Sequence, residues 1–256
     1  MRTIHTLKRM LPAGARSFVK QLLISAKNYI ADIPQPQIKP LIEKYCLGNG
    51  IEIGPGKKPY CDPARTVFLD KYTGNKDACV NPDVVSDASA IPFADGNFSF
   101  LFSAHCLEHC PNTLRTLYEW ERVLKPGGVL FLILPHADRT FDKYRARTTL
   151  EHHIRDYETL SDKPDYSHNE EIKEGWSKNP DFELQKNKYE QDWGAKVWDF
   201  EFRIRNGVMH YHVWTQDEII KVLQYAGMEI LYVAERLPER DDSFLIIARK
   251  NSQAGK

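Results

Sequence analysis

The sequence predicts an α/β protein built on a doubly wound parallel sheet, and three observations lead to this prediction. From Lys39 onward, the pattern of a strand, a turn and a helix recurs along the chain. The first expected strand ends in a glycine bend, Gly54-Pro55-Gly56, and residues 129–134 form an unbroken apolar run. Such a run is typical of a parallel strand with both faces covered. The alternation of strands and helices then indicates helices on both faces of one sheet.

The apolar pattern sets the expected elements in order. Strands are expected at residues 49–53, 66–70, 83–87, 98–103 and 129–134. A helix follows the fourth strand, with Leu114, Leu117 and Val123 at helical spacing, and it ends where Pro126 cannot continue it and Gly127 supplies a left-handed cap. A later helix starts with a capping box from Thr215 to Glu218 and ends at Gly227.

Composition limits the class of protein. The chain has 256 residues, 42% of them apolar and 27% charged, which suits one globular domain with an insertion. Its 35 basic and 35 acidic residues balance, so no overall field favours a nucleic-acid partner. No apolar run approaches the roughly 18 residues of a membrane span. The cysteines are odd in number and form no C-x-x-C pair, which predicts reduced thiols in a cytoplasmic protein. They are Cys46, Cys61, Cys79, Cys106 and Cys110.

We expect residues 1–38 to form a basic helical segment and linker, and residues 39–250 to form the main domain. The first 31 residues contain six basic side chains and no acidic one. An amphipathic helix is expected at residues 16–30, before the proline-rich linker. Three roles stay open for it: docking on an anionic membrane surface or a membrane-bound enzyme at the inner membrane face, an organelle transit peptide, or packing on the main domain.

Ligands of doubly wound sheets bind beyond the carboxyl ends of the strands, so the residues there are the candidate site. The glycine bend lacks the third glycine of a dinucleotide fingerprint, which disfavours a pyrophosphate ligand. It allows close approach of a ligand with an amino-acid tail. Asp70 can accept from ribose hydroxyls and Asp87 from an adenine amine. These features together describe an adenosine compound with a cationic centre.

The same motifs, in this order, resemble the class I S-adenosylmethionine-dependent methyltransferases. The resemblance covers about residues 48–136 and is nearest to the branch of quinone, glycan and small-molecule methyltransferases. It is carried by residues 50–56, Asp70, and residues 87–98, 107–109 and 123–128. It implies a Rossmann-like seven-stranded sheet with an antiparallel last strand, for which residues 228–233 and 243–248 fit as the closing pair. It also implies S-adenosyl-L-methionine as cofactor.

This resemblance carries over to seven cofactor-binding positions, each of which has a plainer alternative as a turn, a strand end or a helix cap. These positions are Glu52, Gly54, Gly56, Asp70, Asp87, Ala88 and Ser103. One departure is Lys57, which stands where the family has a third small residue. Its long side chain must therefore point outward.

A hydroxyl acceptor must lose a proton, and histidine is the usual base near neutral pH. His136 follows the fifth strand and is our first candidate for this catalytic role. His105 and His109 follow the fourth strand and are the others. A purely structural histidine at a strand end is the alternative for each.

Residues 137–212 exceed what the core fold needs and are expected to form a substrate lid after the fifth strand. The segment is rich in aromatic and hydrogen-bonding side chains, which suits a sugar or a polysaccharide-related acceptor. A fainter likeness to methyltransferases of bacterial surface-polysaccharide synthesis points the same way. The expected substrate-binding residues are Asp142, Arg145, His210 and His212.

Several alternatives stay open. The acceptor can instead be a small aromatic, quinone or lipid molecule at a membrane surface, or the protein can be a non-catalytic cofactor-binding module. We expect no metal. The spacings Cys106-x-x-His109-Cys110 and His210-x-His212 are nevertheless ones that metal sites use.

Overall fold

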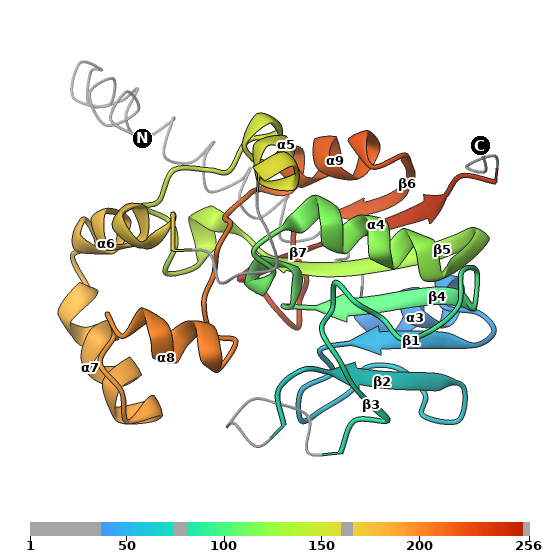
Figure 1. Cartoon of the computed structure of the whole chain (residues 1–256), viewed down its shortest axis with the longest axis horizontal. Helices are drawn as coiled ribbons and strands as arrows, with labels where there is room; N and C mark the ends of the chain where they lie inside the picture. Colours follow the sequence, from blue (N-terminus) through green and yellow to red (C-terminus); the bar gives the residue numbers. More distant parts are fainter. Residues whose placement is uncertain (1–36, 74–80, 160–165, 253–256) are drawn as a thin grey trace, which may run out of the picture. The chain divides into compact units, whose positions relative to one another are not determined.

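The computed structural model describes residues 37–73, 81–159 and 166–252 (Figure 1). Residues Gln37–Lys256 belong to one compact unit. Within the described residues, no helix is long and apolar enough to cross a membrane. The helix expected at residues 16–30 and Cys79 lie outside the described residues, so the predictions made for them stay as they were.

A seven-stranded sheet with the strand order β3-β2-β1-β4-β5-β7-β6 forms the centre of this unit. The strands are β1 (Gly50–Ile53), β2 (Thr66–Asp70), β3 (Val84–Val85), β4 (Phe98–Ala104), β5 (Leu124–Pro135), β6 (Met228–Ala234) and β7 (Ser243–Lys250). The first five strands pair in parallel, and β7 runs antiparallel to both of its neighbours. The predicted sheet with its antiparallel last strand is therefore confirmed.

Two details of the predicted elements change. The third strand shortens to two residues. The helix after β4 is α4 (Thr113–Val123). Leu124, which follows it, is already extended and is the first residue of β5. Gly127 has a positive φ of 74°, but it lies four residues beyond Val123, the last residue of the helix, so its predicted role as the helix cap is wrong.

The other predicted helix has both of its signals confirmed. Helix α9 (Gln216–Tyr225) starts with a capping box between Thr215 and Glu218. Gly227 follows it with a φ of 84°, in the left-handed region that glycine adopts without strain. The helix packs against β6 and β7.

Helices cover both faces of the sheet. Helix α3 (Ile38–Tyr45) lies on one face, where Ile38 and Ile42 pack with Phe102 and Ile133. On the other face α4, α5 (Leu150–Thr159) and α9 pack together over the larger apolar core. Each large apolar side chain buried there contributes roughly 1.5–3 kcal/mol relative to its exposed state.

The insertion after β5 divides into two parts. Its first helix, α5, packs on α4 and α9, and Leu150 and Ile154 join the main core, so this part is a structural layer and not a lid. The next three helices share a separate apolar cluster, and Figure 1 shows them at the end of the sheet to which the parallel strands point. They are α6 (Asn169–Ser177), α7 (Phe182–Trp193) and α8 (Phe200–Arg205). We call residues 169–205 the lid.

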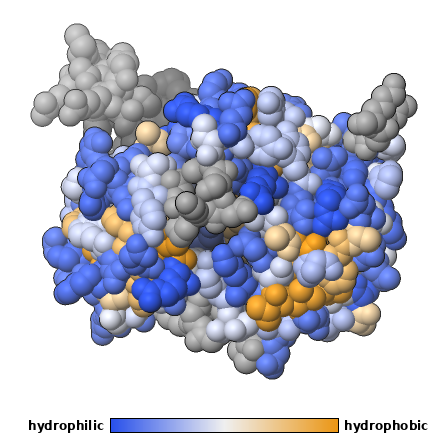
Figure 2. Space-filling view, in the orientation of Figure 1, coloured by the Kyte–Doolittle hydropathy of each residue, from blue (hydrophilic) through white to orange (hydrophobic). Residues whose placement is uncertain are grey.

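The surface drawn in Figure 2 is mostly hydrophilic, with hydrophobic side chains gathered mainly in its lower right part. Hydrophilic side chains thus cover most of this face.

Candidate active site

Two adjoining cavities lie at the carboxyl ends of the parallel strands. The larger measures about 800 Å³ and extends under the lid, and the smaller measures about 380 Å³ and reaches β3. The residues that line both are Gly54, Asp70, Tyr72, Cys106, His109 and Gly207. The two cavities therefore form one cleft that runs from the end of β2 to the lid.

The glycine bend after β1 forms a wall of this cleft. Gly54 and Gly56 have φ angles of 65° and 57°, a region that side chains with a Cβ rarely adopt. A Cβ at Gly54 would lie 3.1 Å from the Cβ of Cys106, so glycine lets the bend pack closely against Cys106 in the wall of the cleft. Lys57 is exposed, as predicted.

Glu52 has a different role from the predicted one. Its buried carboxylate accepts hydrogen bonds from the backbone N–H groups of Tyr60 and Cys61, at 3.0 and 2.9 Å. Burial raises the pKa of Glu52. Because its oxygens are used inside the loop and the side chain lines neither cavity, Glu52 fastens the loop that follows the glycine bend.

The two strand-end acids both reach the cleft. Asp70 lines both cavities and accepts from the backbone N–H of Tyr72 at 2.9 Å. Asp87 lines the smaller cavity, where Lys71 Nζ lies 2.7 Å from Oδ2 and Ser89 donates to Oδ1. Burial opposes the ionisation of Asp87, but these partners lower its pKa below the usual value.

Of the two remaining cofactor candidates, one lies at the cleft. Ala88 lines the smaller cavity, and its carbonyl accepts from the indole N–H of Trp120 at 2.9 Å. Ser103 is buried in β4 and lines neither cavity; its hydroxyl donates to the carbonyl of Ile53 at 3.2 Å. Its contact therefore links β4 to β1 and does not face a ligand.

His105 and His109 line the larger cavity, and both lie near the same oxygen of a buried carboxylate. His105 Nδ1 lies 3.4 Å and His109 Nε2 lies 3.9 Å from Oε1 of Glu108, which is fully buried. His105 has a φ of 53°, and its Nε2 lies 2.8 Å from Ser243 Oγ. Strain of this kind often accompanies functional sites.

His109 is held in one tautomer. Its Nδ1 lies 2.9 Å from the carbonyl oxygen of Met209, which can only accept, so Nδ1 carries the hydrogen. Burial lowers the pKa of His109 to about 4, so the ring is neutral at pH 7 and its Nε2 has a free lone pair.

His136, the first of the predicted bases, lies apart from the cleft. It is buried beside Phe244, its Nδ1 accepts from the backbone N–H of Asp138, and it lines neither cavity. Its pKa is lowered by burial and by the charge of Arg139. The structure therefore revises the order of the base candidates.

Asp142, Arg145 and His210 form one connected group. Asp142 Oδ1 accepts from Arg145 Nη1 at 3.0 Å, and its Oδ2 lies 2.7 Å from His210 Nδ1. Arg145 also bonds Glu171 and the carbonyls of His210 and Tyr211. Among the three, His210 alone lines the larger cavity. Asp142 and Arg145 therefore hold His210 in place and do not face substrate as predicted.

His212 also departs from its predicted place. Residues 210–212 belong to no helix or strand, and their histidines face different surroundings. His210 contacts Asp142, whereas His212 is buried between Thr113 and Asp156. His212 lines neither cavity, so it is no substrate ligand here.

The lid supplies aromatic and charged walls to the larger cavity. Trp176, Tyr189 and Trp193 line it, which confirms that part of the predicted aromatic lining. Arg203 of α8 lines it as well, and the sequence analysis missed this residue. Arg203 as a whole is 2% exposed, and its guanidinium lies over the rings of Trp176 and Tyr189, at 4.8 and 5.7 Å from their centroids.

Among the described residues, none forms a hydrogen bond with Nε or Nη1 of Arg203. Burial lowers its pKa. A buried guanidinium with unsatisfied donors is costly unless a ligand satisfies them. One signal in the sequence pointed to it: Arg203 stands three residues after Phe200, on the apolar face of a short helix.

Comparison with known proteins agrees with this architecture. Residues 60–132 match the family described as "Methyltransferase domain". The match runs from just before β2 into β5 of the seven-stranded sheet. This part of the chain is therefore similar to a methyltransferase domain.

Individual relatives are distant. Phosphoethanolamine N-methyltransferase 2 of Caenorhabditis elegans is 29% identical over 68 residues, which are 27% of this chain and 15% of that protein's length. A SAM-dependent methyltransferase of Methanosarcina mazei is 18% identical, with a TM-score of 0.45, over 84% of this chain and 99% of that one. One from Mesorhizobium loti is 16% identical, with a TM-score of 0.47, over 82% and 96%.

The residues of this cleft fit S-adenosylmethionine. A Cβ at Gly54 would press on Cys106 in the wall of the cleft, Asp70 lines both cavities, and Asp87 with Ala88 lines the smaller cavity. These residues would hold the cofactor. Tyr72 and Cys106 join them, although the sequence analysis did not assign either of them to the cofactor.

Proposed function

We propose that this methyltransferase domain O-methylates a sugar or polysaccharide-related acceptor that carries an acidic group. One observation carries the proposal: the cofactor cleft opens directly into a large cavity whose walls are aromatic and charged. Donor and acceptor must be held side by side for an in-line transfer, and a shared cleft allows this.

The lining of the lid cavity supports a polar acceptor. Flat aromatic side chains, Trp176 and Trp193, stand among hydrogen-bonding groups such as Asp138, Lys143 and Lys188. Aromatic faces pack on the C–H faces of a sugar ring, while the polar groups match its hydroxyls. A quinone or a lipid chain would favour aliphatic walls.

An acidic group on the acceptor follows from Arg203. Its buried guanidinium lines the same cavity and has donors without partners. A carboxylate or a phosphate would satisfy those donors in the fork geometry that arginine favours. Uronic acids, sugar phosphates and nucleotide sugars all carry such a group.

When bound, S-adenosylmethionine supplies a methyl group that is already strongly electrophilic. The residues of this chain exclude water, orient the acceptor and remove its proton. Trp176 and Trp193 of the lid help to shield the cavity from water, and Arg203 orients the acceptor. His210 takes the hydroxyl proton on Nε2, since Asp142 accepts from Nδ1 and so fixes the tautomer. His109 lies beside it, with ring centroids 4.8 Å apart.

Calorimetry with S-adenosylmethionine tests the cofactor half of the proposal. Asp70→Ala should weaken binding by about 1–3 kcal/mol, the range for losing a charged hydrogen-bond partner. Asp95→Ala, whose carboxylate is exposed on the surface beside Arg122, is the matched control and should bind normally. If the wild-type chain binds no cofactor, the non-catalytic alternative and the enzyme proposal both lose their basis.

A methyl-transfer screen tests the acceptor half. Its arms are uronic acids, sugar phosphates and nucleotide sugars, then neutral sugars, quinols, lipids and phosphoethanolamine. We expect turnover with acidic sugars. Turnover confined to quinols or lipids would support the alternative acceptor class, and turnover confined to phosphoethanolamine would show that Arg203 recognises the phosphate of an amine substrate.

We also propose that the protein docks at the inner membrane face. The basic segment that suggests this location lies outside the described residues. Sedimentation with anionic liposomes should lose the protein from the pellet when residues 1–31 are deleted. Equal sedimentation of both forms would remove the membrane-docking role.

A further inference from the structure

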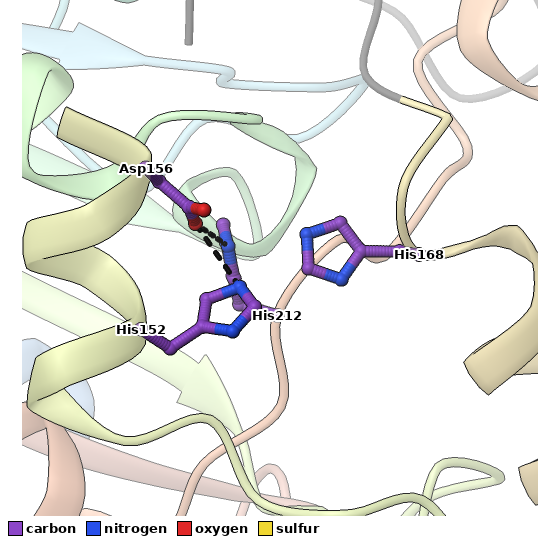
Figure 3. Close-up of side chains that lie close together, drawn as sticks. All are labelled: His152, Asp156, His168 and His212. Carbon is purple, nitrogen blue, oxygen red and sulfur yellow. Dashed lines mark hydrogen bonds and ion pairs between the residues drawn. The ribbon is translucent and has the colours of Figure 1, made fainter. Parts of the chain in front are cut away.

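Four side chains that could all ligate a metal converge at the base of the lid, away from both cavities (Figure 3). Their ligand atoms lie within 4.8 Å of one another. They come from three separate segments of the chain. They are His152 and Asp156 of α5, His168 just before α6, and His212 after α8.

The arrangement centres on one carboxylate. Asp156 Oδ2 lies 2.9 Å from Nε2 of His212 and 3.1 Å from Nε2 of His152, as Figure 3 shows. His152 and Asp156 are four residues apart on α5, which places both on one face of the helix. The ring of His168 lies 5.1 and 5.0 Å from the rings of His152 and His212. Three imidazoles thus surround a single acidic group.

We propose that these residues form a structural zinc site: His152, Asp156, His168 and His212. Three nitrogen ligands and one carboxylate oxygen suit zinc, and four protein ligands close its tetrahedral shell. In such a shell the ligand atoms stand about 3.3 Å apart, from bonds of roughly 2.0–2.1 Å. The ligand atoms now lie up to 4.8 Å apart, and small rotations of these side chains would bring them to that distance.

The neighbours of His212 and Asp156 support a ligand role. His212 Nδ1 lies 3.1 Å from the hydroxyl of Thr113, so a hydrogen on Nδ1 leaves the Nε2 lone pair for a metal. Asn112 donates to the backbone carbonyl of Asp156 at 3.0 Å. Both partners stand at the start of α4, which is buried in the main core. The groups behind these two ligands are therefore anchored to the main core.

A metal ion at this site would connect both ends of the lid to α5. His168 lies immediately before the lid helices and His212 lies soon after them, while α5 is packed on α4 and α9. A zinc ion would join the entry and the exit of the lid to the domain core, and its binding energy would favour the ordered lid. The proposal does not depend on the acceptor or on the base.

A second group of possible ligands lies in the cleft and serves as the competing location. Glu108, His109 and His210 also have ligand atoms within 4.8 Å of one another. This group offers three ligands, against four at the base of the lid. His153, next to His152, is buried against the rings of His212 and Trp214 but is outside both groups, so it is a matched control.

The experiment uses the full chain without an affinity tag. The chain is purified, stripped with a chelator, and reloaded with Zn²⁺ or Co²⁺; metal content, the visible spectrum and the melting temperature are measured. We expect one metal ion per chain, the intense visible bands of tetrahedral cobalt, and a melting temperature that falls on stripping and recovers with zinc. Hydrogen exchange in residues 169–205 should rise in the stripped protein.

Variants then locate the metal. His152→Gln, at a partly exposed position, and His168→Gln should each lower the affinity for cobalt at least tenfold and change its spectrum, whereas His153→Phe and His109→Gln should leave both unchanged. Absence of metal binding in the wild-type chain overturns the proposal without any variant. Binding that survives in His152→Gln and His168→Gln but is lost in His109→Gln would place the metal in the cleft and overturn it as well.

Discussion

His210 Nδ1 lies 2.7 Å from Oδ2 of Asp142, and this bond joins the lid cavity to a buried charge. Burial opposes the ionisation of Asp142, but His210 and Arg145 lower its pKa to about 2, so it remains a carboxylate. A carboxylate behind an imidazole fixes the tautomer and stabilises the ring when it takes a proton. The same logic governs bases in many unrelated enzymes.

We predict that His210→Gln keeps cofactor affinity and lowers kcat by about 10²–10⁴-fold, the usual contribution of a general base. The acceptor KM should change little. Steady-state methyl transfer with the acceptor found in the screen, together with calorimetry, measures both. His136→Gln is the control and should retain its turnover, since His136 lies outside the cleft. Equal losses in the two variants would remove His210 from this role.

Gly54→Ala should abolish measurable cofactor binding. The added Cβ would meet Cys106 at 3.1 Å and occupy the wall of the cleft. Gly194→Ala is a matched control, because Gly194 has nearly the same φ, 64°, and nothing lies within 4 Å of its Cβ position. Both variants should lose stability through backbone strain, by about 1–2 kcal/mol. Normal cofactor affinity in Gly54→Ala would place the methionine end of the cofactor elsewhere.

Arg203→Met should separate binding from stability. It removes a buried charge that has donors without partners and keeps most of the apolar volume, so the melting temperature should stay level or rise. The KM for an acidic acceptor should rise at least tenfold. Neutral acceptors should show no such change. A sharp fall in melting temperature with an unchanged KM would show that the guanidinium is structural.

The neutral state of His109 predicts a pH dependence of stability. Its pKa is about 4 in the folded protein, below the ordinary value of 6.5, so the unfolded chain binds more protons between these values. His109 therefore leaves the free energy of unfolding unchanged above pH 6.5 and lowers it as the pH falls from 6.5 toward 4. The wild-type melting temperature should fall more steeply over this window than that of His109→Gln. Parallel curves would mean that His109 titrates normally.

The sequence by itself determined the sheet and the cofactor end of the cleft. The carboxyl ends of parallel strands lie at one edge of a sheet. Once the strands are recognised, the sequence therefore predicts that Gly54, Asp70 and Asp87 lie close together at that edge. The glycine bend and the capping box at Thr215 are local signals, because turn and cap geometry depend on a few adjacent residues.

Only the tertiary structure decided the roles of Asp142, His210, Arg203 and His212. The contacts that decide these roles join residues 56 to 99 positions apart or cross from one helix to another, and local pattern holds no information on such pairs. A polar side chain can line a cavity, support a neighbour or join a cluster. Its role depends on which distant residues form hydrogen bonds with its polar atoms. Packing settled that for each of them, and it turned one predicted substrate ligand, His212, into part of a proposed metal site.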